Sequence, residues 1–418
     1  MISTGLADTI LLCSLAVCVA AYVYVSRREG SYLNLLTPTF VIAVPAYYLL
    51  PLVFTVFTRT DATVYAYAYV YATLAVENVV FAYVYTRPAR KLIRLPLAYS
   101  YDNFTSFAFF FIGLSVLTYA PVVLQFPEYI LHPREIYTHT RTGFGIYFYL
   151  SSAFSYLSVI LIQFSNRSRV VKGAVVLAAM AVLILHGSKG QVLSLVLLVA
   201  LFEVYIKGRK VNLWASLLVG AGLGVLGVLL LAATMALGDS PAEALQSMSE
   251  YSDYTRNAML VIDSRFPIQY GRLTMESQII GRIPRAIMPN KPKNFGAMYL
   301  DDYFYPESLD QDAGSPDFGV GVQYADFGYL AIVYLALFAI LRGWLARIFV
   351  TRLRLSRHPS DFFMLAFLAN VSLIPVGGIG WLFPEALLIT LFLRFASSLG
   401  AQKLFRESIR LKRPAYTD

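Results

Sequence analysis

The residues best suited to chemistry lie in one long polar stretch, Gly238 to Tyr324, which separates two apolar runs. Its charges are divided along its length. The first part is rich in bases, at Arg256, Arg265, Arg272, Arg282, Arg285, Lys291 and Lys293. The last part carries acids with no base between them, at Asp301, Asp302, Glu307, Asp310, Asp312 and Asp317. A basic half beside an acidic half indicates a site that meets an anion.

A second candidate is Lys189, in the predicted tight turn of residues 186–190 between two short apolar runs. A positive charge in a glycine-flanked turn, beside the free N–H groups that begin the next helix, suits a phosphate. The alternative is that Lys189 only extends to lipid head groups. Each arginine of the long stretch could likewise be a solvated charge. A further segment, 126–143, adds Arg141 together with His132 and His139.

The composition excludes a soluble globular protein of this size. Of the 418 residues, 58% are hydrophobic and only 14% are charged, and the mean hydropathy is +0.61. This leaves too little polar surface for a water-soluble fold. The net charge of +9 comes mostly from bases in short loops, where they set topology, so we expect no nucleic-acid partner. Cys13 and Cys18 lie in the first apolar run, where neither a disulfide framework nor a zinc site is expected.

The elements that must position these residues are membrane-spanning helices, because lipid offers no partner to unpaired backbone groups. About eleven apolar runs are long enough to cross roughly 30 Å of hydrocarbon. They lie near 6–26, 36–57, 64–85, 104–125, 144–165, 170–186, 190–206, 213–237, 325–349, 361–377 and 383–400. We therefore predict an all-α, polytopic membrane protein with a single helical domain over 1–418. Residues 238–324 form its one large loop, between the eighth and ninth transmembrane helices.

The orientation follows from the bases in the short loops. They gather in every second segment between the runs, near 27–28, 87–94, 167–172, 207–210, 352–357 and 403–413. Cytoplasmic loops carry an excess of Lys and Arg. This predicts an external N-terminus, a cytoplasmic C-terminus and an extracytoplasmic loop 238–324.

Ionisable residues within the apolar runs are costly and are functional candidates by default. Glu77, in the third run, has no partner evident in the sequence, and a hydrogen bond to a neighbouring helix explains it as well as catalysis would. Arg394, in the last run, is expected to extend toward the cytoplasmic head groups.

Three short stretches of the chain carry a resemblance to a known family. They are Gly187-Ser188-Lys189-Gly190, Ile283-Pro284-Arg285-Ala286-Ile287-Met288-Pro289-Asn290-Lys291-Pro292 and Gly321-Val322-Gln323-Tyr324-Ala325-Asp326-Phe327-Gly328-Tyr329-Leu330. With its multi-span layout and large external loop, the chain resembles the Wzy-like O-antigen polymerases, a family of oligosaccharide repeat-unit polymerases. It departs from the family pattern at Lys189, where arginine is frequent, and at Gln323, where glutamate is frequent.

The resemblance implies a multi-span fold like that of GT-C glycosyltransferases, in the bacterial inner membrane. It implies that a glycan is transferred from undecaprenyl pyrophosphate to an acceptor repeat unit at the outer face of that membrane. The expected partners are the undecaprenyl-pyrophosphate-linked glycans and membrane lipid, and a chain-length regulator is a further partner to consider. No cofactor is expected, and the acidic run 301–317 matches no standard calcium loop, so no metal is expected either.

Cleaving a sugar from a lipid pyrophosphate leaves an anionic group, which cations aimed at the developing charge would stabilise. Arginine can hold two phosphate oxygens at once. The acceptor hydroxyl also needs a general base, for which Asp253, Asp263, Asp317, Asp326 and Glu276 remain open. Our catalytic candidates are Arg256, Arg285 and Asp326. Our candidates for binding pyrophosphate or glycan are Lys189, Arg265, Arg282, Lys291, Arg141 and Tyr324.

Three other functions deserve comparison. An O-antigen ligase would be expected to carry a catalytic histidine in the large loop, and residues 238–324 contain no histidine. Another polyprenyl-phosphate-dependent glycosyltransferase would show paired acids in its first outer loop, whereas residues 58–63 offer only Asp61. A flippase or transporter of the same lipid-linked sugar would need charged groups along its spans, where Glu77 alone is thin support.

The alternating basic loops predict opposite locations for two positions. A reporter fused after Asp310 should behave as extracytoplasmic, and one fused after Arg357 as cytoplasmic. Paired alkaline phosphatase and fluorescent protein fusions measure both. The same signal from the two fusions would contradict the predicted topology.

Overall fold

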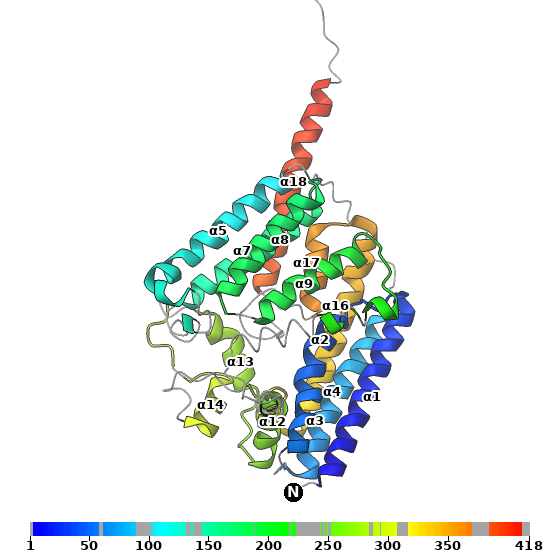
Figure 1. Ribbon diagram of the computed structural model, residues 1–418, viewed down its shortest axis with the longest axis vertical. Coiled ribbons are helices and arrows are strands. Elements are labelled where there is room, and N and C mark those ends of the chain that lie inside the picture. The colour runs from blue at the N-terminus through cyan, green and yellow to red at the C-terminus, as the bar shows by residue number, and fades with distance from the viewer. Residues whose placement is uncertain are drawn as a thin grey trace, which may run out of the picture. The chain divides into compact units, whose positions relative to one another are not determined.

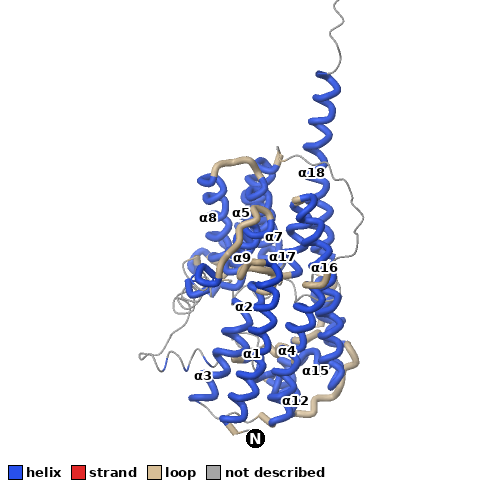
Figure 2. Tube along the Cα trace, turned by 90° about the vertical axis from the view of Figure 1, so that its right-hand side faces the viewer, coloured by secondary structure: helices blue, strands red, loops and turns tan. Residues whose placement is uncertain are grey.

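The computed structural model describes most of the chain. Within the described part every regular element is a helix and there is no strand, which confirms the all-α prediction (Figure 2). At Ile42, Lys189, Pro384 and 400–411 it describes the backbone alone. The described residues are 3–57, 62–88, 101, 103–130, 135–136, 144–187, 189–216, 218, 220–222, 243, 246, 249, 252–283, 287–292, 294–306, 317–369 and 384–411.

The chain divides into two compact units, each assembled from segments far apart in the sequence. Unit 1 comprises Met1–Pro88, Lys210–Arg347 and Val376–Leu382, and unit 2 comprises Ala89–Arg209, Ile348–Pro375 and Phe383–Asp418. The helix α16 (Ala331–Ser356) contributes to both. One domain over 1–418 stays a prediction.

Unit 1 holds the first helices of the chain and the described part of the long loop (Figure 1). Among its helices α1 packs on α4, and α12 packs on both α4 and α15. Its elements are α1 (Thr4–Glu29), α2 (Thr37–Val44), η1 (Pro45–Leu49), α3 (Leu50–Phe57), α4 (Val64–Tyr85), α12 (Asp253–Asp263), α13 (Arg272–Ile279), η3 (Ile280–Arg282), α14 (Met298–Phe304), α15 (Gly321–Phe327), η5 (Gly328–Leu330) and the first part of α16.

Unit 2 is built around α7, which packs against α5, α8, α9 and α17. Its most extensive contact is the one between α5 and α7. Its elements are α5 (Phe104–Gln125), η2 (Pro127–Tyr129), α7 (Gly145–Phe164), α8 (Arg169–Leu185), α9 (Lys189–Tyr205), the end of α16, α17 (Pro359–Leu368) and α18 (Pro384–Leu411).

Several of the predicted membrane spans are present as long apolar helices. Within the part of the chain that the structure describes, six segments are long and apolar enough to cross a membrane: Thr4–Glu29, Thr37–Thr55, Val64–Tyr85, Phe104–Gln125, Gly145–Phe164 and Gly321–Ser356. The last begins earlier than the predicted run 325–349. Gly190–Tyr205, Leu213–Gly222 and Pro359–Leu368 are shorter apolar helices. Most of the run 213–237 and residues 370–377 of the run 361–377 fall outside the described residues, so the count of eleven stays a prediction.

Glu77 has a partner inside the helix bundle of unit 1. Its Oε1 lies 3.4 Å from Nη1 of Arg342, which projects from α16. The guanidinium of Arg342 also lies over the ring of Phe81, 4.5 Å from its centroid. Arg342 is only 3% exposed. The pair satisfies a charge that would otherwise be isolated among apolar helices, which gives Glu77 a structural role.

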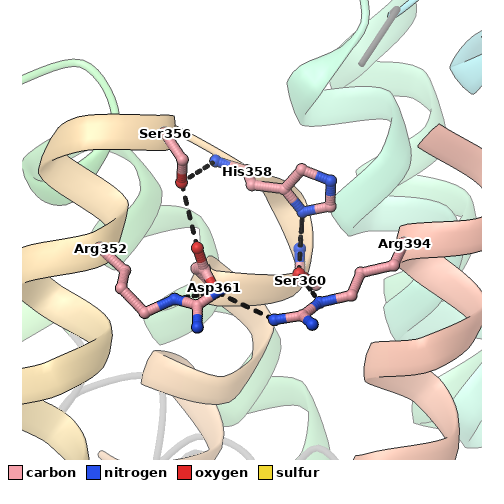
Figure 3. A network of polar contacts seen from close by, with 6 residues as sticks. All are labelled: Arg352, Ser356, His358, Ser360, Asp361 and Arg394. Atoms are coloured by element: carbon pink, nitrogen blue, oxygen red, sulfur yellow. Dashed lines mark hydrogen bonds and ion pairs between the residues drawn. The ribbon is translucent and has the colours of Figure 1, made fainter. Parts of the chain in front are cut away.

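A junction of polar side chains joins α16, α17 and α18 in unit 2 (Figure 3). Buried Asp361 accepts a hydrogen bond from Ser356 Oγ at 3.0 Å and pairs with Arg352 at 3.2 Å and Arg394 at 3.8 Å. The charge of Arg394, expected near the head groups, therefore also meets a carboxylate. His358 begins α17, where its Nδ1 accepts the backbone N–H of Ser360 at 3.2 Å.

Burial lowers the pKa of His358 to about 4, an effect that Asp361 opposes and the two arginines reinforce. The ring is therefore neutral at pH 7 and keeps a lone pair on Nδ1 for the Ser360 amide. A neutral imidazole in this position caps α17 without adding a further positive charge to the junction.

Removing Glu77 should destabilise the protein, because it leaves Arg342 buried and unpaired. We expect Glu77→Ala to cost about 3 kcal/mol, near the lower limit for a buried pair because Glu77 is partly exposed. Thermal unfolding of the purified protein in detergent measures this. The matched control is Glu203→Ala, which breaks pairs with the more exposed Lys207 and Arg209 and should cost less than about 1 kcal/mol. Equal loss from both variants would argue against the structural role of Glu77.

Candidate functional site

The helix α12 carries the candidate site and is anchored to the membrane helices by its apolar face. Ala258, Met259 and Ile262 are buried in one cluster with Tyr67 and Tyr71 of α4. At the other end of α12, Asp263 accepts two hydrogen bonds from Thr63, one from its N–H at 2.8 Å and one from its Oγ1 at 2.5 Å. Thr63 is itself the N-cap of α4. The start of α4 and the end of α12 are thus joined by one carboxylate.

The chain that leads into α15 lies directly on the backbone of α12. A Cβ at Gly321 would fall 2.7 Å from Cα of Ala258, and one at Gly319 would fall 2.6 Å from the carbonyl oxygen of Tyr254. Gly319 also has a φ of +48°, which favours glycine. Only residues without a side chain fit this contact, which brings the end of the acidic stretch onto the first turn of α12.

The contact gathers charged and polar groups at the N-terminal end of α12. The exposed Arg256 lays its guanidinium over the ring of Phe54 in α3, 4.1 Å from the centroid. Asn257 donates to the carbonyl of Asp317 at 3.0 Å and accepts from the hydroxyl of Tyr305 at 2.7 Å. Figure 1 shows α12 beside α3 and α4. We call Asp253, Arg256, Tyr305 and Asp317 the α12 site.

Asp253 and Arg256 are three residues apart on α12 and share one face of the helix. Burial raises the pKa of Asp253, an effect that Arg256 opposes and that Asp317 reinforces. Burial likewise raises the pKa of Tyr305, against the influence of Arg256. Asp253 is therefore a stronger base than a solvated aspartate, and it lies next to a permanent positive charge. A base and an anion-binding group side by side can remove a proton while holding a phosphate.

Asp326 is committed to a backbone contact. It is completely buried, and its two oxygens accept the N–H groups of Leu273 at 2.8 Å and Thr274 at 2.7 Å. These are free donors at the start of α13, so the carboxylate caps that helix from α15. This geometry gives Asp326 a positioning role, and its catalytic role stays a prediction.

Two other candidate bases are also engaged. Asp263 is held by Thr63, as described above. Glu276 pairs with Arg272 at 2.7 Å and accepts the N–H of Gly296 at 2.9 Å. Burial alone would raise the pKa of Glu276, but these two contacts lower it. Of the five carboxylates considered, Asp253 and Asp317 remain with raised pKa values.

Two O-antigen polymerases are similar to this chain over nearly its whole length. Two curated proteins with that name, from Salmonella typhimurium strain LT2 and from Salmonella typhi, are each 35% identical to this chain over 416 residues. Each alignment covers 96% of this chain and 98% of the relative. This chain belongs to the O-antigen polymerase family. No model of a protein family matches the chain, and no solved structure matches it either.

Membership of the O-antigen polymerase family identifies the chain as a membrane glycosyltransferase that polymerises lipid-linked repeat units. It does not favour the ligase or the flippase. Among the described residues, no group of three or more His, Cys, Asp or Glu side chains could hold a metal ion. The groups that the sequence predicts to meet the pyrophosphate are cationic side chains.

The predicted cations occupy different surroundings. Lys291 donates to the carbonyls of Gly281 at 3.3 Å and Ile283 at 3.0 Å, and Arg282 donates to the carbonyl of Gln278. Both therefore hold the chain where η3 ends.

The other predicted cations lie at other places in the chain. Arg265 is exposed in the turn after α12, with a φ of +54°. Lys189 begins α9, and only its backbone is described. Arg285 and Arg141 lie outside the described residues.

Tyr324, predicted to bind glycan, belongs to a group of four tyrosines, which we call the tyrosine group. Its ring lies 5.0 Å from that of Tyr69 and 6.1 Å from that of Tyr329, both edge to face. Tyr65 lies against Tyr69 and Tyr329. The Tyr69 hydroxyl also donates toward the carbonyls of Gly328 and Tyr329. The rings are thus fixed, and Tyr329 is 69% exposed.

Sequence reasoning missed Tyr305 and Phe54. Tyr305 reaches the site through Asn257, which is far from it in the sequence, and Phe54 reads as an ordinary residue of an apolar span. The spacing of Asp253 and Arg256 was the one signal available, since residues three apart share a helical face once the helix is known.

The capping role of Asp326 can be separated from catalysis. Asp326→Ala leaves two buried N–H groups unpaired and should cost about 2 to 3 kcal/mol of stability. Asp326→Asn keeps one acceptor oxygen and should cost less. Thermal unfolding and limited proteolysis of the loop measure both variants. An alanine variant that unfolds like the wild type but makes no polymer would instead place this carboxylate in the chemistry.

Proposed function

We propose that the α12 site transfers the growing glycan from undecaprenyl pyrophosphate to the acceptor repeat unit. Arg256 contacts the pyrophosphate and Asp253 is the general base. The observation that carries this proposal is the pairing, on one face of α12, of an exposed guanidinium with a carboxylate whose pKa is raised.

In the proposed step, a hydroxyl oxygen of the acceptor sugar bonds to the anomeric carbon of the donor glycan. The bond from that carbon to the pyrophosphate oxygen breaks, and its electron pair leaves with the phosphate. The hydroxyl proton passes to Asp253. Charge grows on the departing oxygen, where a guanidinium stabilises it through charge-assisted hydrogen bonds. Atoms and electrons balance without a nucleotide or a covalent intermediate.

The neighbours of Asp253 suit it to this task. A carboxylate with an ordinary pKa is a weak base toward a sugar hydroxyl, and a raised pKa brings it closer to the working pH. Burial supplies most of the rise and Asp317 adds to it. Tyr305 keeps its proton because its own pKa is raised as well, so it stays a hydrogen-bond donor.

The remaining predicted cations have supporting roles in this proposal. Arg285 joins Arg256 in catalysis, and Arg282 and Lys291 hold the chain that leads to it. Arg265, Arg141 and Lys189 bind phosphate or glycan. Tyr324 and the rest of the tyrosine group offer rigid aromatic surface to the sugars, at little cost in conformational entropy.

The proposal includes a location and a partner. We place the protein in the bacterial inner membrane, with its N-terminus and the loop 238–324 outside and its C-terminus in the cytoplasm. The reaction needs no metal, because arginine and lysine neutralise the pyrophosphate. A chain-length regulator is the protein partner that we propose.

The proposal predicts a graded loss of activity in purified protein supplied with defined lipid-linked repeat units. Arg256→Ala should lower the polymerisation rate by about ten- to a hundredfold, and lysine should rescue it only in part because it cannot form a bidentate contact. Asp253→Asn should lower the rate by about a hundredfold or more.

The wild-type rate should also fall as the pH drops through the raised pKa of Asp253, and the asparagine variant should lack that decline.

The matched control is Arg272→Ala, on the same loop. Its guanidinium is half exposed and pairs with Glu276, so its loss should change the rate little. Full polymer yield from both Arg256→Ala and Asp253→Asn, at normal protein levels, would refute the α12 site.

A further inference from the structure

A single buried serine in unit 2 contacts both sides of the turn that precedes α9. Ser152 lies on α7 and is completely buried. Its Oγ lies 3.2 Å from Nδ1 of His186, the C-cap residue of α8, and donates to Oε1 of Gln191 at 2.9 Å. Gln191 belongs to the first turn of α9. The serine thus bridges the end of one helix and the start of the next.

The surrounding hydrogen bonds fix the orientation of each partner. Ser151 bonds to the other ring nitrogen of His186 at 3.1 Å, and Tyr156 donates to the backbone carbonyl of Gln191 at 2.8 Å. Because Ser152 gives its proton to Gln191, its oxygen accepts from Nδ1 of His186. The Ser151 hydroxyl itself donates to the backbone carbonyl of Ser115 at 2.8 Å, on α5. Polar groups this deeply buried are costly unless paired, and His186 is only 1% exposed.

The turn between α8 and α9 contains two glycines, which restrict its backbone little. Gly187 has a φ of +68°, and a Cβ added at Gly190 would meet nothing within 4 Å. Glycine permits many backbone conformations, so the chain between α8 and α9 is constrained by what holds its two ends. Ser152 contacts both ends of this turn, at His186 and at Gln191.

We infer that Ser152 is a positioning residue for Lys189, the first residue of α9. By holding His186 and Gln191 together, Ser152 sets where α9 starts and so where the backbone of Lys189 lies. This inference rests on the proposed role of Lys189 in binding a phosphate of the lipid-linked substrate. Ser152 itself touches no substrate.

A double-mutant cycle tests the inference. Ser152→Ala, Lys189→Ala and the double variant are purified, reconstituted in lipid and assayed for kcat/KM toward the lipid-linked donor. We expect each single variant to lose roughly tenfold. The double variant should be no slower than Lys189→Ala, because residues that act as one unit are not additive. A serine with a merely structural role would give losses that multiply.

Ser158→Ala is the matched control. Ser158 is also a buried serine of α7, and its hydroxyl donates to the carbonyl of Ala108 at 2.8 Å, on α5. It should keep the wild-type kcat/KM. If Ser152→Ala fails to fold, Gln191→Met removes the acceptor from the α9 side and takes its place in the cycle.

The outcomes are distinct. Non-additive losses with a silent Ser158→Ala support the inference. Losses that multiply, or an equal loss in Ser158→Ala, overturn it while leaving the role of Lys189 intact. No loss in Lys189→Ala refutes the proposed role of Lys189 and the positioning role with it, and it leaves the α12 site to be judged by Arg256 and Asp253.

Discussion

A polar group without a partner is unusually costly in this chain, because apolar side chains and lipid replace water around most of its helices. The structure meets this constraint with side chains that bridge helices. Arg342 meets Glu77, Asp361 meets two arginines, and Ser152 meets His186 and Gln191. Each bridge joins different helices, so these polar residues of the interior help to fix how neighbouring helices pack.

The same constraint separates structural carboxylates from the one that we assign to chemistry. Asp326 and Asp263 each accept two hydrogen bonds, which hold the starts of α13 and α4. The oxygens of both carboxylates are therefore engaged in holding helix ends. Asp253 differs, because burial and a second acid raise its pKa, an effect that the neighbouring Arg256 opposes. We therefore assign the proton transfer to Asp253, the acid whose pKa is raised beside an arginine.

The sequence predicted much of the fold, because length and hydropathy decide whether a segment can cross a membrane. Long runs such as 104–125 and 64–85 appear as helices with nearly the predicted bounds. The roles of the polar residues were harder to predict. Asp326 looked like a base because its partners, the amides of Leu273 and Thr274, are far away in the chain and have no sequence signature. Glu77 looked isolated for the same reason, since only folding brings Arg342 to it.

The link between Asp263 and Thr63 has a consequence for the growing product. It ties α12 to the first turn of α4, and a helix that crosses a bilayer cannot slide along the membrane normal without dragging its polar ends into hydrocarbon. In the proposed topology, the α12 site is thereby kept at one height relative to the lipid. Phosphates on a polyprenol also stay near one height, that of the head groups. The reacting bond would then lie in the same place for a glycan of one repeat or of many, so polymer length would depend on when the chain is released and not on how far the site can reach.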